Sequence, residues 1–248
     1  MRPTKRLRHS SQYPLYLRTN NALDKTVLSI LVNEAKRLTY TSSDHATAES
    51  KCFCFNACVR WNNDLEPEII HQSSLLSNSR NLSLEVQNAS LALIKHAGQQ
   101  TDKISKIGKT SWIAFELIRI PLDKKIVIPP LQWHKDPGYF DNLAEETSYY
   151  ADTTTIFMLT DPRTWKGGVL ELQVNGLDRG DKPHLETRTS EKIKYNYNDA
   201  ITFYNKDSRH KVSKIESLNG SEDRIIFTCS IYGSNETKEY CNHFKIEF

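Results

Sequence analysis

Residues 131–136 read Leu-Gln-Trp-His-Lys-Asp and combine strand-like alternation with two potential metal ligands. Successive side chains of a β-strand point to opposite faces, so Gln132, His134 and Asp136 would share one face. Two ligands on one strand therefore converge by geometry alone. A third must come from elsewhere, and His210 follows 74 residues later (210 − 136) within Asp-Ser-Arg-His-Lys-Val. A rigid sheet would hold such a site better than loops would.

Short apolar runs separated by turn residues fill the chain after residue 110. The breaks include Asp161-Pro162, Gly167-Gly168 and Asn198-Asp199. Strands at this spacing, without alternating helices, favour a mainly β fold with flanking helices (α+β), namely a double-stranded β-helix or jelly roll. The expected strands are 112–120, 131–136, 153–160, 168–174, 186–196, 200–204, 210–215 and 224–232.

The first hundred residues have helical rather than strand periodicity. Apolar residues recur at three- and four-residue steps from Leu23 to Leu38, and again from Leu82 to Gly98, where glycine is expected to end the helix. Residues 51–61 between them are typical of a strand. We therefore divide the chain into a basic flexible tail at 1–20, a helical support region with one strand at 21–110, a jelly-roll core at 111–233 and a C-terminal extension at 234–248.

Composition limits the partners that the chain is expected to have. Its net charge of +3 reflects a basic tail, which we interpret as a solvated terminus because no aromatic–basic stripe supports nucleic-acid binding. No apolar run approaches the ~20 residues of a membrane span, and the N-terminus lacks the apolar stretch of a signal peptide. We expect a cytoplasmic protein (or a nuclear one in a eukaryote) that acts on a small-molecule or peptidyl substrate, with no membrane contact.

Five cysteines without a secretory signal indicate reduced thiols rather than disulfides. Cys52, Cys54 and Cys58 alternate with apolar residues, which favours a buried strand. A metal site is the alternative, but no Cys/His pair follows at zinc-finger spacing.

Two imidazoles and one carboxylate with open coordination positions form the facial triad that binds non-haem Fe(II). Arg224 opens the apolar run Arg-Ile-Ile-Phe-Thr-Cys-Ser-Ile-Tyr on a neighbouring predicted strand. Its guanidinium could hold the carboxylate of an organic co-substrate through a bidentate contact. Each residue alone is weak evidence, whereas the four together in this order indicate a metal-dependent oxygenase.

The chain resembles the Fe(II)- and 2-oxoglutarate-dependent dioxygenases, particularly their prolyl-hydroxylase-like branch. The resemblance spans roughly residues 112–232. The matching segments are Trp-His-Lys-Asp-Pro, then Thr-Thr-Ile-Phe-Met-Leu-Thr-Asp with Trp165-Lys-Gly-Gly-Val-Leu-Glu-Leu, then Asp-Ala-Ile-Thr-Phe-Tyr before His210, and Arg224-Ile-Ile-Phe-Thr.

This resemblance implies that His134, Asp136 and His210 bind the iron. It implies that Arg224 clamps the distal carboxylate of 2-oxoglutarate, and Thr228 on the same strand face could add a hydroxyl there. The implied reaction uses Fe(II), 2-oxoglutarate and O2, with ascorbate as a candidate reductant. It hydroxylates a C–H bond of an amino-acid, peptidyl or other small organic substrate and releases succinate and CO2.

Three features depart from the family pattern. The interval from His210 to Arg224 is 14 residues (224 − 210), and a polar hairpin loop would absorb the excess. Met158 stands about where a tyrosine often contacts the co-substrate, with Thr154 or Tyr150 as stand-ins. A second His-X-acid pair at 184–186 lies too close to His210 for the expected strand order.

Residues 137–151 form a connection long enough to be a lid over the substrate. Tyr139, Phe140, Tyr149 and Tyr150 would shape its mouth, and Glu145-Glu146 would favour a cationic substrate. A solvated acidic loop whose aromatic residues pack on the sheet explains the segment equally well.

Two other functions compete with the oxygenase. One is a catalytically inactive jelly-roll binding module, which would need no convergent His, Asp and His. The other is a zinc hydrolase, because His and Asp also bind Zn(II). The hydrolase leaves Arg224 unexplained and lacks a general base at convincing spacing.

Overall fold

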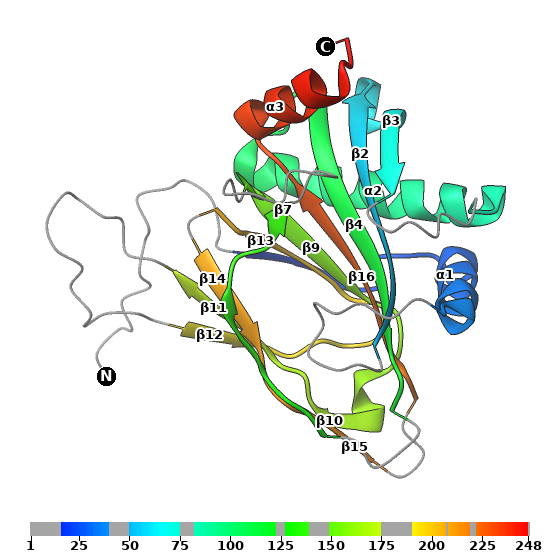
Figure 1. Cartoon of the computed structure of the whole chain (residues 1–248). Coiled ribbons are helices and arrows are strands. Elements are labelled where there is room, and N and C mark those ends of the chain that lie inside the picture. Colours follow the sequence, from blue (N-terminus) through cyan, green and yellow to red (C-terminus); the bar gives the residue numbers. More distant parts are fainter. Residues whose placement is uncertain are drawn as a thin grey trace, which may run out of the picture.

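A computed structural model describes residues 16–39, 50–74, 82–122, 127–138, 149–174, 190–206, 208–218 and 222–247. Its centre is an antiparallel seven-stranded sheet in the order β1-β13-β9-β16-β4-β2-β3 (Figure 1). The strands are β1 Tyr16–Thr19, β2 Lys51–Trp61, β3 Pro67–Ser74, β4 Thr110–Ile120, β9 Thr153–Met158, β13 Ala200–Tyr204 and β16 Arg224–Ile231.

Shorter strands lie opposite this main sheet and complete the jelly roll (Figure 1). One minor sheet has the order β12-β11-β14-β6, another has the order β10-β15-β5, and β7 pairs with β8. Their bounds are β5 Val127–Ile128, β6 Leu131–His134, β7 Pro137–Gly138, β8 Tyr149–Tyr150, β10 Trp165–Gly167, β11 Leu170–Val174, β12 Ser190–Ile193, β14 Ser208–Val212 and β15 Ile215–Ser217. The predicted fold class is confirmed.

In the described residues, three α-helices flank the strands: α1 Lys25–Arg37, α2 Leu84–Ser105 and α3 Ser234–Phe244. Helix α1 begins at Asp24, whose carboxylate accepts hydrogen bonds from the amides of Thr26 (2.8 Å) and Val27 (2.9 Å). Helices α1 and α2 lie against the outer face of the main sheet, and α3 lies across one end of it (Figure 1). None of the helices in the described ranges is long and apolar enough to cross a bilayer.

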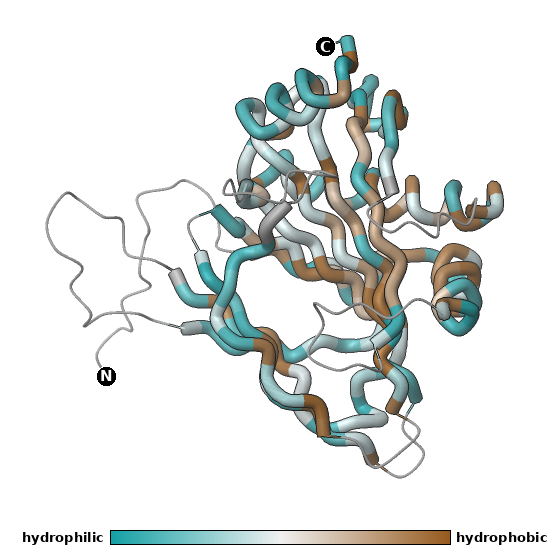
Figure 2. The backbone as a smooth tube through the Cα atoms, viewed as in Figure 1, coloured by the Kyte–Doolittle hydropathy of each residue, from teal (hydrophilic) through white to brown (hydrophobic). Residues whose placement is uncertain are grey.

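The main sheet is buried on both faces, because its strands alternate between two cores. Phe115, Phe157 and Phe227 belong to the core shared with α1 and α2. Ile118 and Ile226, at positions of opposite parity, belong to the core shared with the minor sheets. Figure 2 shows the resulting apolar stretches along the strands. Polar residues on the second face therefore lie inside the jelly roll, where the candidate site is found.

Several predicted boundaries are wrong in informative ways. The 21–110 region contains β2 and β3 rather than one strand. The predicted strand 210–215 is divided into β14 and β15 by Ser213 and Lys214. Within the predicted strand 186–196, residues 190–193 form β12, and 186–189 lie outside the described residues.

The predicted core strand with three cysteines is confirmed as β2, and all five cysteines are buried free thiols. Cys58 Sγ lies 3.3 Å from Cys241 Sγ of α3. Burial raises the pKa of the Cys58 thiol well above its usual range. No Cys belongs to a cluster of possible metal ligands in the described part of the chain, so the alternative hypothesis of a metal site on this strand gains no support.

Gly98 does not end the second helix, which continues to Ser105. Its role is close packing: a Cβ at this position would lie 2.6 Å from Cη2 of Trp61, a residue that is only 7% exposed. A glycine within a helix allows such an approach of an aromatic ring at some cost in helix propensity.

Changing Gly98→Ala should therefore destabilise the protein by about 1–3 kcal/mol, because Trp61 must shift in a packed core. The measurement is the free energy of unfolding in urea. In a Trp61→Leu background the same substitution should instead stabilise by up to about 1 kcal/mol, from helix propensity alone. An equal effect in both backgrounds would contradict the proposed contact.

His96 of α2 is partly buried and lies edge-on against Phe157, with ring centroids 5.5 Å apart and its Nε2 atom buried. Burial, with a smaller effect from the charge of Lys103, lowers the pKa of His96 to about 4. The unfolded chain therefore binds a proton between pH 6.5 and 4 that the folded chain excludes. Stability from this residue is complete above pH 6.5 and falls as the pH drops through that interval.

The variant His96→Leu should lose about 2 kcal/mol less stability than the wild type between pH 7 and pH 5. Urea unfolding at both pH values measures this difference, with wild type and variant treated identically. Parallel losses in the two proteins would show that His96 does not cause the acid sensitivity.

Candidate metal centre

The structure brings the three predicted ligands together. One ligand atom from each of His134, Asp136 and His210 lies within 4.8 Å of the others, and in the described residues they form the sole cluster of this kind. His134 Nε2 and His210 Nε2 are 3.6 and 3.3 Å from Asp136 Oδ1. The donor set and its spacing fit a divalent metal held on one face.

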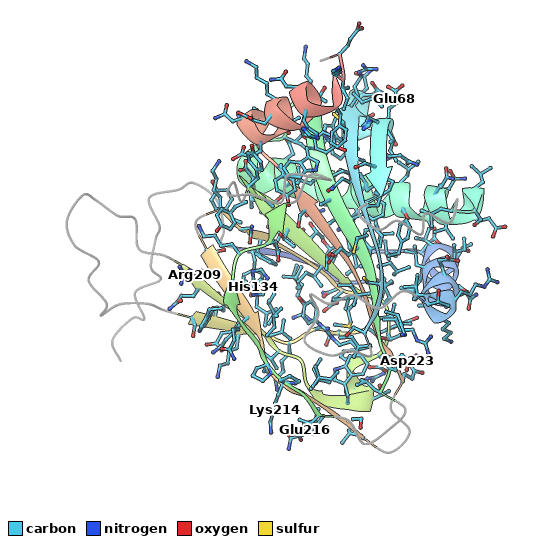
Figure 3. All side chains as sticks on the ribbon, viewed as in Figure 1. Glu68, His134, Arg209, Lys214, Glu216 and Asp223 are labelled. Carbon is cyan, nitrogen blue, oxygen red and sulfur yellow. The ribbon has the colours of Figure 1, made fainter. Side chains whose placement is uncertain are left out.

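Adjacent strands position the two histidines. His134 pairs with His210 in the β6–β14 ladder, and their ring centroids are 4.0 Å apart. The register shifts directly afterwards, since Leu131 pairs with Val212. Such a bulge adds twist and re-aims side chains at the rim of a sheet. Figure 3 shows His134 inside the fold, whereas Arg209, the exposed neighbour of His210, points outward.

The ring of His134 is oriented by its own strand. Its Nδ1 lies 2.7 Å from the carbonyl oxygen of Gln132, so Nδ1–H donates there and Nε2 remains for a metal. Burial alone would lower the pKa of His134, but the hydrogen bond and charge of Asp136 outweigh it and raise the pKa.

Asp136 is held as an anion. Burial would raise the pKa of its carboxyl, but His210 and hydrogen bonds from His134, His210 and Thr154 lower it far below its usual range. Thr154 Oγ1 donates to Asp136 Oδ2 over 2.6 Å and lies 3.1 Å from Ser230 Oγ. Thr154 therefore supports a predicted ligand, and because it also lines the cavity, the co-substrate contact predicted for it stays a prediction.

These residues open into a cavity of about 470 Å³ between the main sheet and β6 and β14. This size is within the range of small-molecule sites. The walls are largely apolar, and Arg224 and Thr228 of β16 line the same cavity as the three ligands, as do Ile118, Ile120, Ile128, Ile156, Val212, Ile215 and Ile226.

Arg224 is a buried cation at the start of β16, only 5% exposed. Burial lowers the pKa of its guanidinium, with a smaller opposing effect from Tyr195. Its Nε has no hydrogen-bond partner, and across the described ranges no carboxylate lies within 4 Å of it. A buried charge without a partner costs several kcal/mol, so this position is suited to an anionic ligand.

The predicted lid residues are only partly described. Tyr150 is 42% exposed with the ammonium of Lys135 5.2 Å from its ring centroid, and Tyr149 lies edge-on to Trp112 at 6.0 Å. Neither is among the described residues that line the cavity. Tyr139, Phe140, Glu145, Glu146 and the His184/Glu186 pair lie outside the described residues.

Tyr232 is a cavity residue that the sequence interpretation missed. Its ring stacks on Trp112 with centroids 3.7 Å apart, and Trp112 stacks in turn on Tyr240 of α3 at 5.3 Å. Strand alternation could have predicted it, because Tyr232 is eight positions beyond Arg224 and so lies on the same face. The aromatic stack fixes one wall of the cavity.

Comparison with solved structures identifies the fold. IDO from Bacillus thuringiensis aligns with a TM-score of 0.57 and 13% identity over 89% of this chain and 90% of its own. The Fe(II)/α-ketoglutarate-dependent dioxygenase TqaL aligns at 0.56 with 11% identity, covering 88% of this chain and 82% of TqaL. A Pseudomonas putida prolyl-4-hydroxylase aligns at 0.50 with 10% identity, covering 88% and 92%.

The chain shares its fold with Fe(II)/2-oxoglutarate dioxygenases. No protein-family model matches the sequence, and no curated protein matches it either. At 10–13% identity the likeness concerns the fold alone. The chemistry must therefore be argued from the triad, Arg224 and the cavity of this chain.

Proposed function

We propose that this protein is an Fe(II)- and 2-oxoglutarate-dependent dioxygenase that hydroxylates a C–H bond of an amino-acid, peptidyl or other small organic substrate. The observation that carries the proposal is one cavity that combines a His-Asp-His cluster with a buried arginine that forms no ion pair within the described residues. Metal ligands alone would suit several enzymes. The guanidinium of Arg224 in the same cavity additionally favours an anionic co-substrate near the metal.

The residues present fit the metal. His134, Asp136 and His210 would each supply one ligand atom from a single side, which leaves other positions for small molecules. The Gln132 carbonyl and the Thr154 hydroxyl hold two of the ligands in orientation. Bound Fe(II), with 2-oxoglutarate and O2, would supply the oxidising power for hydroxylation, and succinate and CO2 would be released.

The residues also fit 2-oxoglutarate. Arg224 would bind one carboxylate of the co-substrate through its planar guanidinium, which would give its Nε the partner that no described residue supplies. Thr228, on the same strand face and lining the same cavity, is placed to add a hydroxyl. The apolar walls exclude water and strengthen the charge–charge contact.

Turnover provides the direct test. Purified protein with Fe(II), 2-oxoglutarate, O2 and ascorbate should convert 2-oxoglutarate to succinate, with a 16-dalton gain on an accepted substrate detected by mass spectrometry. Omission of Fe(II) or O2 is the control. Metal uptake without succinate formation across a broad panel of amino acids, peptides and metabolites would reject the oxygenase. Hydrolysis without O2 would favour a zinc hydrolase, and no stoichiometric metal uptake would favour a binding module.

We further propose that the protein acts inside the cell, in the cytosol or in the nucleus of a eukaryote. Five buried free thiols support a reducing compartment. A nucleic-acid substrate is disfavoured because the cavity walls are mainly aliphatic, with Tyr232 as the aromatic side chain among the described lining residues.

A further inference from the structure

The side chain of one buried residue, Asn205, makes two hydrogen bonds to the main chain of Asp136. The Asp136 amide donates to Asn205 Oδ1 over 3.1 Å, and Asn205 Nδ2 donates back to the Asp136 carbonyl over 3.2 Å. Asn205 is 0% exposed and directly follows β13. The side-chain amide therefore adds to the main-chain hydrogen bond that the Ala151 amide donates to the Asp136 carbonyl over 3.4 Å, just beyond the end of β6.

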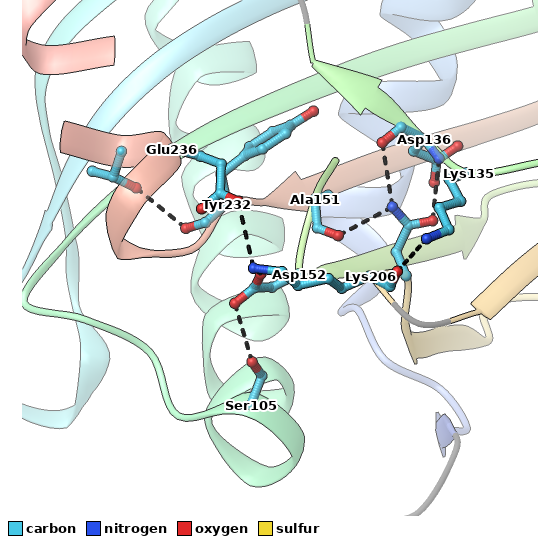
Figure 4. Close-up of polar contacts among 10 residues, drawn as sticks. Ser105, Lys135, Asp136, Ala151, Asp152, Lys206, Tyr232 and Glu236 are labelled. Carbon is cyan, nitrogen blue, oxygen red and sulfur yellow. Dashed lines mark hydrogen bonds and ion pairs between the residues drawn. The ribbon is translucent and has the colours of Figure 1, made fainter. Parts of the chain in front are cut away.

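The same amide joins a second segment. Asn205 Nδ2 also donates to the Ala151 carbonyl over 3.1 Å, and the Asn205 main-chain N–H donates to the Asp152 carbonyl over 2.7 Å. Figure 4 draws the hydrogen bonds that reach Asp136 and Ala151. Two residues beyond Asp152, Thr154 holds the Asp136 carboxylate. Asn205 thus holds the main chain of Asp136 close to residues 151–154. That same segment carries Thr154, which holds the Asp136 carboxylate.

Asn205 also precedes the strand that carries His210. β14 begins three residues later, at Ser208, and places His210 beside His134. One side chain consequently links the segment that bears Asp136, the segment that leads to Thr154 and the connection that leads to His210. A side-chain amide offers one acceptor and two donors at once, as these contacts require, whereas a carboxylate cannot donate and an apolar side chain can do neither.

We infer that Asn205 is a positioning residue that sets metal affinity by holding Asp136 in register with His134 and His210. This inference rests on the proposed metal centre. Asn205 does not touch the metal site directly and acts through the Asp136 backbone. Loss of such an outer hydrogen-bond partner typically weakens metal binding by roughly 10–100-fold.

The protein provides a matched control for the loss of a buried amide. Asn198 Oδ1 accepts from the Leu23 amide (3.1 Å), and Asn198 Nδ2 donates to the Leu23 carbonyl (2.8 Å). Asn198 is 8% exposed and makes the same reciprocal contact with a main chain, but to the segment that precedes α1. Its backbone φ is +59°, a conformation that aspartate tolerates, so Asn198→Asp removes the donor without adding strain.

The experiment measures Mn(II) binding to the full-length protein by equilibrium dialysis, beside the unfolding midpoint of each variant. Asn205→Asp should bind Mn(II) roughly 10–100-fold more weakly than the wild type. Asn198→Asp should lose stability but keep wild-type Mn(II) affinity. If Asn205→Asp does not fold, Asn205→Ser, which leaves room for a water molecule, takes its place with the same expectation.

Each outcome has a distinct meaning. Mn(II) affinity of the Asn205 variant within twofold of the wild type would overturn the positioning role. Equal weakening in the Asn205 and Asn198 variants would also overturn it, because general destabilisation would then explain the effect. Absence of Mn(II) binding to the wild type would instead reject the metal centre itself, and the inference with it.

Discussion

The variant Asp136→Ala should bind no stoichiometric Fe(II) and form no detectable succinate from 2-oxoglutarate. Asp136 supplies the anionic ligand, accepts a hydrogen bond from Thr154 and lies 3.6 and 3.3 Å from the Nε2 atoms of the two histidines. Its removal leaves two imidazoles without a carboxylate ligand, which are a poor site for Fe(II). We expect a loss beyond the roughly 10–100-fold that removal of an outer hydrogen-bond partner causes. Anaerobic Fe(II) equilibrium dialysis measures the affinity, and succinate analysis measures turnover.

A partly exposed aspartate, Asp161, serves as the control. Asp161 pairs with Arg163, far in sequence from the three ligands, and contributes no atom to the cavity. The variant Asp161→Ala should keep the wild-type Fe(II) affinity. Retention of Fe(II) affinity within tenfold by Asp136→Ala would show that the carboxylate is not a metal ligand.

The variant Arg224→Met should bind 2-oxoglutarate at least about 100-fold more weakly, because truncation of one member of a buried charge pair costs about 2–5 kcal/mol. Without ligand, the same variant should be as stable as the wild type or more stable. Methionine fills the volume, and the unpaired buried charge is gone. Calorimetric titration with 2-oxoglutarate and urea unfolding measure the two effects.

Arg18 provides a control, because its replacement is expected to lower stability and to leave 2-oxoglutarate affinity unchanged. Its guanidinium pairs with Asp199, whose side chain is 2% exposed. The variant Arg18→Met should therefore lower stability, since it leaves a buried carboxylate without its partner, and should leave 2-oxoglutarate affinity unchanged. Unchanged 2-oxoglutarate affinity in Arg224→Met would remove the basis for the proposed co-substrate. A loss of stability in that variant would mean that Arg224 already has a partner in the folded protein.

Strand alternation was enough to predict the centre of the site. His134 and Asp136 are two positions apart on one short segment, and Arg224 and Thr228 are four positions apart on another, so each pair shares a face. The pairing of β6 with β14 was not readable from the sequence, because no local signal says which strands become neighbours. The order of the motifs supplied that information through resemblance to a known family.

The residues that the sequence did not reveal act through tertiary contacts. Glycine is typical of a helix end, yet Gly98 lies within α2 and permits the close approach of Trp61 from β2. Asparagine is typical of turns, yet the side chain of Asn205 forms hydrogen bonds with the main chain of Asp136, 69 positions away. β3 lacks a long apolar run because its edge position leaves polar side chains in solvent.

Iron-edge anomalous diffraction from crystals grown anaerobically with Fe(II) and 2-oxoglutarate tests the central claim most directly. We expect one anomalous peak between His134, Asp136 and His210, and a carboxylate of 2-oxoglutarate within about 3 Å of the Arg224 guanidinium. A peak elsewhere, or a co-substrate carboxylate bound away from Arg224, would contradict the account.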